Sequence, residues 1–136
     1  MNKKYLTAYV GTALAMIALE ALWLGLIAKP LYQQGIGHLM TDTLNIPAAL
    51  LFYVLYPLGL VIFAVAPQTG GSGWAKTATM GALFGLFAYA TYDLTNLATL
   101  KGWPVGLALI DMAWGTFVSA VAATAGKAVM GWAARR

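Results

Sequence analysis

Residues 46–66 read IPAALLFYVLYPLGLVIFAVA, an apolar run without a single charged side chain. A membrane hydrocarbon core of about 30 Å takes roughly 20 helical residues to cross, and this run supplies them. Because the run is continuous and does not alternate between apolar and polar positions, it predicts a membrane-spanning helix and not a strand of a membrane barrel.

Three further stretches have the same character, so that spans are expected over residues 5–28, 46–66, 77–100 and 104–126. Turn-forming residues separate them: Lys29-Pro30 follows the first, Pro67 the second, and residues 101–104 (KGWP) the third. We therefore expect an all-α polytopic membrane protein, a single domain over residues 1–136 with four transmembrane helices in a compact bundle.

The composition supports this class. Hydrophobic residues make up 61% of the chain and charged residues 9%, against roughly 25% charged in soluble domains. The formal charge of +4 comes from residues near the ends of apolar segments, so it is typical of membrane topology and does not indicate nucleic-acid binding. The chain has no cysteine, which excludes disulfides, iron–sulfur clusters and thiolate catalysis.

The positive residues also predict the orientation. With the amino terminus inside, two of them face outward, Lys29 and Lys101, and the other six are cytoplasmic: Lys3, Lys4, Lys76, Lys127, Arg135 and Arg136. Both termini are then cytoplasmic. The first apolar run continues well past Ala13-Leu14-Ala15, which favours a retained span over a cleaved signal peptide.

Two connections are long enough to have structure of their own. Residues 29–45 intersperse apolar and polar side chains, which fits either a short interfacial helix or an ordered polar loop. Residues 67–76 contain Gly70, Gly71, Ser72 and Gly73 and are typical of a flexible linker.

Three of the four acidic residues, Glu20, Asp93 and Asp111, lie inside predicted spans. A charged group at bilayer depth is costly and is kept away from lipid, so it marks a candidate functional site. Each lies about 10–12 Å below the outer end of its helix at 1.5 Å per residue, and Tyr53 lies at the same depth. We expect these groups to share one polar pocket.

Helical spacing adds neighbours to these acids. Trp23 and Trp114 lie three residues after Glu20 and Asp111, and Tyr56 extends the face that carries Tyr53. The candidate ligand- or proton-binding residues are Glu20, Asp93, Asp111, Asn96, Tyr53, Tyr92, Tyr89, Trp23 and Trp114.

Neighbouring carboxyls cannot all be ionised in a low-dielectric site without compensation, so one holds a proton or the group shares a cation. An oxygen-only cation site at Glu20, Asp93 and Asp111 is one alternative. The only histidine, His38, lies in a connection, so a zinc site is not expected, and no cofactor is expected either.

A purely structural role is the other interpretation of these polar groups. Asp, Asn and Tyr within membranes hydrogen-bond neighbouring helices, and small residues such as Gly81 and Gly85, or Gly11 and Ala15, let helices pack closely.

Three strings within the spans carry a family resemblance. They are residues 19–25 (LEALWLG), 85–96 (GLFAYATYDLTN) and 111–115 (DMAWG), and with them the chain resembles a family of small bacterial four-helix membrane proteins, the domain of unknown function 2177. The resemblance implies a multi-pass protein of the bacterial inner membrane and the importance of these polar positions. It implies no particular activity.

Three functions are compatible with the sequence. The first is a site for a cation, a proton or a small polar ligand, with transport in a parallel homo-oligomer, since one small bundle has little room for its own path. The second is a non-enzymatic subunit that stabilises a membrane complex. The third is an enzyme acting on a lipid or isoprenoid with carboxyl acid/base groups, which is less favoured because no serine–histidine pair or phosphate-binding loop is present. The bilayer itself is the one partner common to all three.

Overall fold

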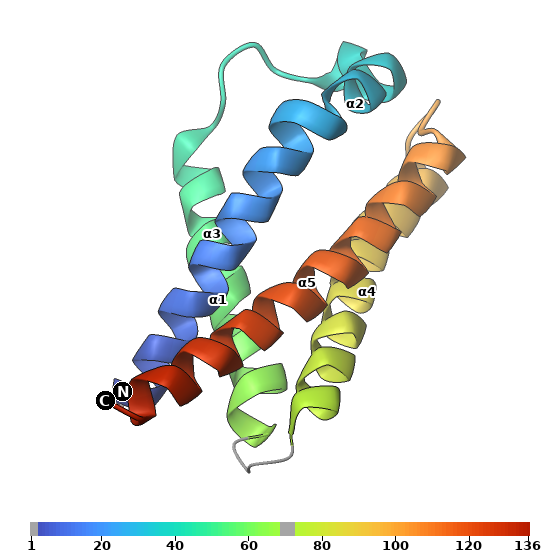
Figure 1. Cartoon of the computed structure of the whole chain (residues 1–136). Helices are drawn as coiled ribbons and strands as arrows, with labels where there is room; N and C mark the ends of the chain where they lie inside the picture. The colour runs from blue at the N-terminus through green and yellow to red at the C-terminus, as the bar shows by residue number, and fades with distance from the viewer. Residues whose placement is uncertain (1–2, 69–72) are drawn as a thin grey trace.

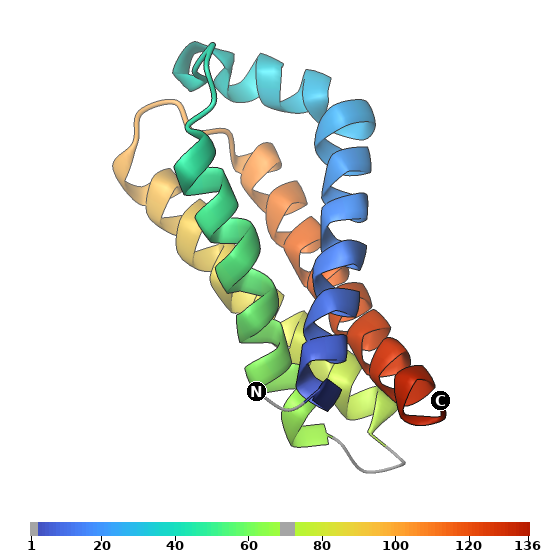
Figure 2. The ribbon, with the colours of Figure 1, turned by 90° about the vertical axis from the view of Figure 1, so that its left-hand side faces the viewer.

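The computed structural model describes residues 3–68 and 73–136, and every regular element in them is helical. Four long helices run alternately up and down, and a short one, α2, lies across the end opposite the two termini (Figures 1 and 2). They are α1 (Lys3–Leu22), α2 (Lys29–Ile36), α3 (Ile46–Leu60), α4 (Trp74–Thr99) and α5 (Val105–Ala134). The predicted linker residues Gly70, Gly71 and Ser72 lie outside the described residues.

Within these residues, three helical segments are long and apolar enough to cross a membrane: Lys3–Ile27, Ile46–Gln68 and Val105–Ala134. The fourth predicted span corresponds to α4, which is 26 residues long. This helix is less hydrophobic than the three spans because it contains Lys76, Asp93, Asn96 and several threonines.

The first two spans contain turns that the sequence does not reveal. The α-helical part of the first span ends at Leu22 and continues as a π-helical turn over Trp23–Ile27. Pro57 lies inside α3 and has no N–H to donate, and the second span continues as a π turn (Val61–Val65) and a 3₁₀ turn (Ala66–Gln68). Of these two kinds of turn, the π turn holds an extra residue and is frequent at functional sites.

Helix α5 extends well beyond the predicted end at residue 126. Gly126 is buried inside the helix, eight residues before its end, at the place where α1 crosses α5. A Cβ atom there would meet the Thr12 hydroxyl and would lie 2.8 Å from the carbonyl oxygen of Ala8. Gly126 therefore permits close helix packing and does not end the helix.

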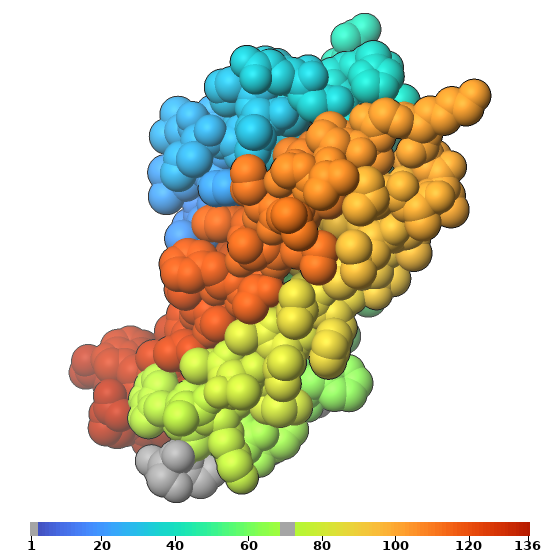
Figure 3. Space-filling view, turned by 90° about the vertical axis from the view of Figure 1, so that its right-hand side faces the viewer, coloured from blue at the N-terminus to red at the C-terminus, as the bar shows by residue number. Residues whose placement is uncertain are grey.

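The other side of α5 packs against α4 in the same way, and Figure 3 shows these two helices side by side. A Cβ at Gly81 would lie 2.9 Å from the carbonyl oxygen of Ser119, and one at Gly85 would meet the carbonyl oxygen of Gly115. This confirms Gly81 and Gly85 as a close-packing surface.

The connection over residues 29–45 contains both of the forms that the sequence left open, a short helix and a loop. Its first part forms α2 and a 3₁₀ turn over Gly37–Leu39, and α2 packs through Gly35 against Pro104 and Leu107 at the start of α5. Its last residues, 40–45, form no helix, and Asn45 caps α3 by accepting the N–H of Ala48 at 3.2 Å.

Helix α3 has buried side chains only in its last third. Tyr56, Pro57 and Leu60 are buried, whereas residues 46–55 contain no buried side chain. The bundle is therefore tightly packed near the termini and open near α2.

Gly126→Ala is expected to lower the free energy of unfolding by about 1–3 kcal/mol, because the new methyl group overpacks the α1–α5 crossing. Gly106→Ala is the control, since a Cβ at this position of the same helix meets nothing within 4 Å. Denaturant unfolding of both variants in detergent checks the prediction, and equal stability of the two would contradict it.

Candidate functional site

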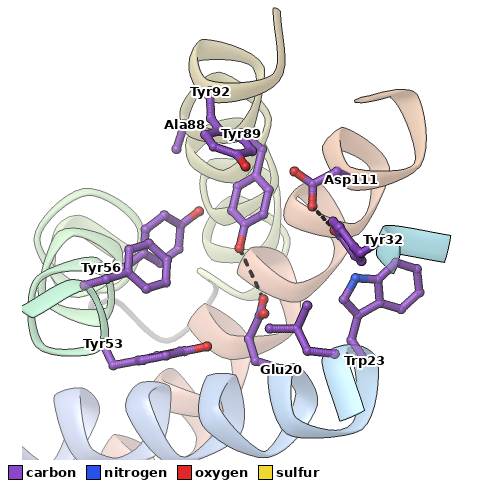
Figure 4. A pocket seen from close by; sticks show the side chains of 11 residues that line it. Glu20, Trp23, Tyr32, Tyr53, Tyr56, Ala88, Tyr89, Tyr92 and Asp111 are labelled. Carbon is purple, nitrogen blue, oxygen red and sulfur yellow. Dashed lines mark hydrogen bonds between the residues drawn. The ribbon is translucent and has the colours of Figure 1, made fainter. Parts of the chain in front are cut away.

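A pocket of about 480 Å³ lies in the open half of the bundle, with all five helices contributing to its wall (Figure 4). Eleven residues line it: Glu20, Trp23, Leu24, Tyr32, Phe52, Tyr53, Tyr56, Ala88, Tyr89, Tyr92 and Asp111. Two carboxyls thus lie in a wall made mostly of aromatic rings.

Glu20 is held by donors from two other helices. Its side chain is 6% exposed, and its Oε1 accepts the indole N–H of Trp114 at 2.9 Å and the hydroxyl of Tyr89 at 3.2 Å. Trp114 in turn stacks on Trp23, with ring centroids 4.4 Å apart and planes 6° apart. The carboxyl is therefore positioned by α4 and α5 although it belongs to α1.

Asp111 is 7% exposed and accepts the hydroxyl of Tyr32 at 2.5 Å. Tyr32 belongs to α2, so this bond links the short helix to α5 (Figure 4). Burial and the hydrogen bond to Asp111 raise the pKa of Tyr32 well above its ordinary value. Tyr32 is therefore a fixed hydrogen-bond donor.

Asp93 lies beside Asp111 and is 1% exposed. It does not line the pocket, and neither of its oxygens has a donor partner among the described residues. Two facing carboxylates only accept hydrogen bonds, so this pair forms a bond when it shares a proton.

Aromatic contacts complete the wall between α3 and α4. Tyr56 meets Tyr89 edge to face with centroids 6.0 Å apart, and its hydroxyl is 2.7 Å from the Ser119 hydroxyl. Phe52 packs against both Tyr53 and Tyr56. Most of these rings contact another ring or form a hydrogen bond, so the wall of the pocket is largely preformed.

Six of the nine residues predicted from the sequence line this pocket: Glu20, Trp23, Tyr53, Tyr89, Tyr92 and Asp111. Trp114 and Asp93 lie behind it, in contact with Glu20 and Asp111 respectively. Asn96 is half-buried, and no described contact joins it to the pocket.

Four residues that line the pocket were not predicted from the sequence: Tyr32, Phe52, Leu24 and Ala88. Tyr56 was predicted only to share the helix face of Tyr53 and not to belong to the site. The sequence gives only a weak indication that Tyr32 belongs to the site, since it is one aromatic residue in an amphipathic connection. Its hydroxyl reaches Asp111 because α2 folds back over the bundle. Among the described residues, no group of three or more His, Cys, Asp or Glu side chains is arranged to hold a metal ion.

Asp93→Asn is expected to stabilise the protein by about 1 kcal/mol near neutral pH, because the amide donates to Asp111 without needing a proton. Thermal unfolding at neutral pH measures the difference from the native chain. Asp42→Asn, at an exposed position, is the control; an Asp93→Asn variant less stable than the native chain would contradict the prediction.

Comparison with known proteins places the chain in a family. The model of the family described as "Predicted membrane protein (DUF2177)" matches residues 5–128, the family that the strings around Glu20, Asp93 and Asp111 resemble. No curated protein and no solved structure matches the chain. Because the family match covers nearly the whole chain, the protein belongs to the DUF2177 family of predicted membrane proteins.

Proposed function

We propose that the protein binds a small ligand with a positively charged group in the pocket between α1, α3, α4 and α5. The observation that carries the proposal is the placement of Glu20 and Asp111, two buried carboxyls, in an aromatic wall whose described lining contains no Lys, Arg or His. The ligand would supply the charge that the wall lacks.

The physical chemistry of the wall favours an organic cation. Rings of Trp, Tyr and Phe attract a cation over their faces, by up to about 2 kcal/mol when water is excluded. Carboxyls buried in an apolar setting need a counter-charge or a proton. The volume of about 480 Å³ is in the usual range for small-molecule sites.

Proton binding belongs to the same proposal. A proton and a cation compete for one carboxyl, so ligand release coupled to protonation would make transport along a pH gradient feasible. A bundle of this size has little room for its own path, so transport would take place in a parallel homo-oligomer.

The proposal includes a topology of four spans. Helix α4 is 26 residues long and packs along α5. If it spans the membrane, both termini lie on one side, as the alternating helices of Figure 1 allow. The excess of Lys and Arg on that side makes it cytoplasmic, with the protein in a bacterial inner membrane.

A second candidate is a subunit that stabilises a membrane complex. It is favoured by residues 46–51 of α3, which are without a buried side chain, do not line the pocket and could receive a partner helix. An enzyme acting on a lipid or isoprenoid is a third; the Tyr32–Asp111–Asp93 group is the acid/base machinery that it would use.

Tetramethylammonium is expected to bind the purified protein in nanodiscs and to raise its Tm, since a ligand of the folded state stabilises it. Glu20→Gln and Asp111→Asn are each expected to weaken binding by about tenfold or more, because each removes one charge beside the cation. Acidification is also expected to weaken tetramethylammonium binding, because protons compete with the cation for the carboxyls.

Asp42→Asn is the matched control, since Asp42 is the acidic residue outside the spans and is exposed. Affinity unchanged in the Glu20 and Asp111 variants, or no binding at all, would overturn the proposal. Loss of folding in both variants would favour the structural role.

The topology is testable because the chain has no native cysteine. Lys101→Cys, after the end of α4, is expected to react with a membrane-impermeant maleimide in intact spheroplasts, and Lys76→Cys, in its first turn, only after permeabilisation. Reaction of both variants in intact spheroplasts, or of neither, would show that α4 does not cross the membrane.

A further inference from the structure

We infer that the ligand is an amphiphile, a cationic head on a hydrocarbon chain, which reaches the pocket sideways from the membrane interior. The inference rests on the proposed function, because the head would lie against Glu20 and Asp111. It adds to that function the hydrocarbon chain of the ligand and the route by which the ligand enters the pocket.

The pocket is polar at its base and apolar at its rim. Glu20 and Asp111 are 6% and 7% exposed, whereas the rim residues Leu24, Phe52 and Tyr92 are 46%, 39% and 51% exposed. A ligand complementary to this gradient has its charge inside and its apolar part outside.

On the side formed by α3 and α4, the rim lies within the helices and not at their ends. Phe52 follows the start of α3 by six residues and Tyr92 precedes the end of α4 by seven, which places both about 10 Å from the helix ends. Leu51 and Leu55, near Phe52 in α3, are 58% and 53% exposed. In a spanning helix these side chains contact acyl chains, so the rim opens toward lipid.

The gap between α3 and α4 forms this side opening. Among the described ring contacts, Tyr56 joins the two helices through Phe84 and Tyr89. Nearer to α2, Phe52 and Tyr53 line the pocket on one side and Ala88 and Tyr92 on the other. The hydrocarbon chain of the ligand would lie between them.

Access from the end of the bundle is restricted by α2. The Tyr32 hydroxyl extends from α2 to Asp111 (Figure 4). Gly35 of the same helix packs against Pro104. Figure 3 shows α2 covering the adjoining end of α5. The side between α3 and α4 is the less covered route.

The test compares dodecyltrimethylammonium with tetramethylammonium in nanodiscs, below the micelle concentration of the former. The long-chain probe is expected to bind tighter by about tenfold or more, because each CH₂ removed from water contributes roughly 0.8 kcal/mol. The gain is limited to this size because only part of the hydrocarbon chain makes contacts in the pocket beyond those it makes in lipid. The Glu20→Gln, Asp111→Asn double variant measures partition into lipid, which is subtracted.

Ala88→Leu narrows the opening and is expected, through overpacking, to lower the affinity for the long-chain probe by about fivefold or more relative to the affinity for tetramethylammonium. Ala98→Leu, at an exposed position on the same helix, is the control and is expected to change neither.

Equal carboxyl-dependent affinity for both probes would overturn the lateral route and leave the proposed function standing. Absence of carboxyl-dependent binding by either probe would overturn both. The comparison of the two probes on the native chain decides the inference even if Ala88→Leu does not fold.

Discussion

The constraint on which this structure depends is the cost of placing carboxyls in an apolar bundle. Glu20, Asp93 and Asp111 lie on three different helices, and each is withdrawn from the surface. Glu20 takes donors from α4 and α5, and Asp111 takes one from α2. Because no helix can satisfy its own acid, the acids oblige the helices to meet in one arrangement.

Helix α5 makes that arrangement compact at one end and open at the other. Gly126 lets α1 approach near the termini, and Gly115 lets α4 approach further along. The two neighbours of α5 are thus fixed, whereas α3 is buried only in its last third. The pocket occupies the space that this uneven attachment leaves, and its polar base and apolar rim follow from the same geometry.

Much of this was predictable from the sequence. Apolar runs predicted the helices, and the rarity of acids in such runs pointed to Glu20 and Asp111, which line the pocket. The π turn at residues 23–27 and the extension of α5 past Gly126 were not predictable, since both depend on contacts between helices. Tyr32 was missed for the same reason: its hydroxyl meets Asp111 across 79 positions of sequence.

The π turn over Trp23–Ile27 has a consequence for how the site is kept in register. Consecutive residues of an α-helix are rotated by about 100°, and a π turn holds an additional residue. Deleting one residue there would restore an ordinary turn and swing everything beyond it, α2 included, around the helix axis. Tyr32 would then point away from Asp111. The number of residues in this turn therefore determines the direction in which the Tyr32 hydroxyl points, five residues after the turn ends.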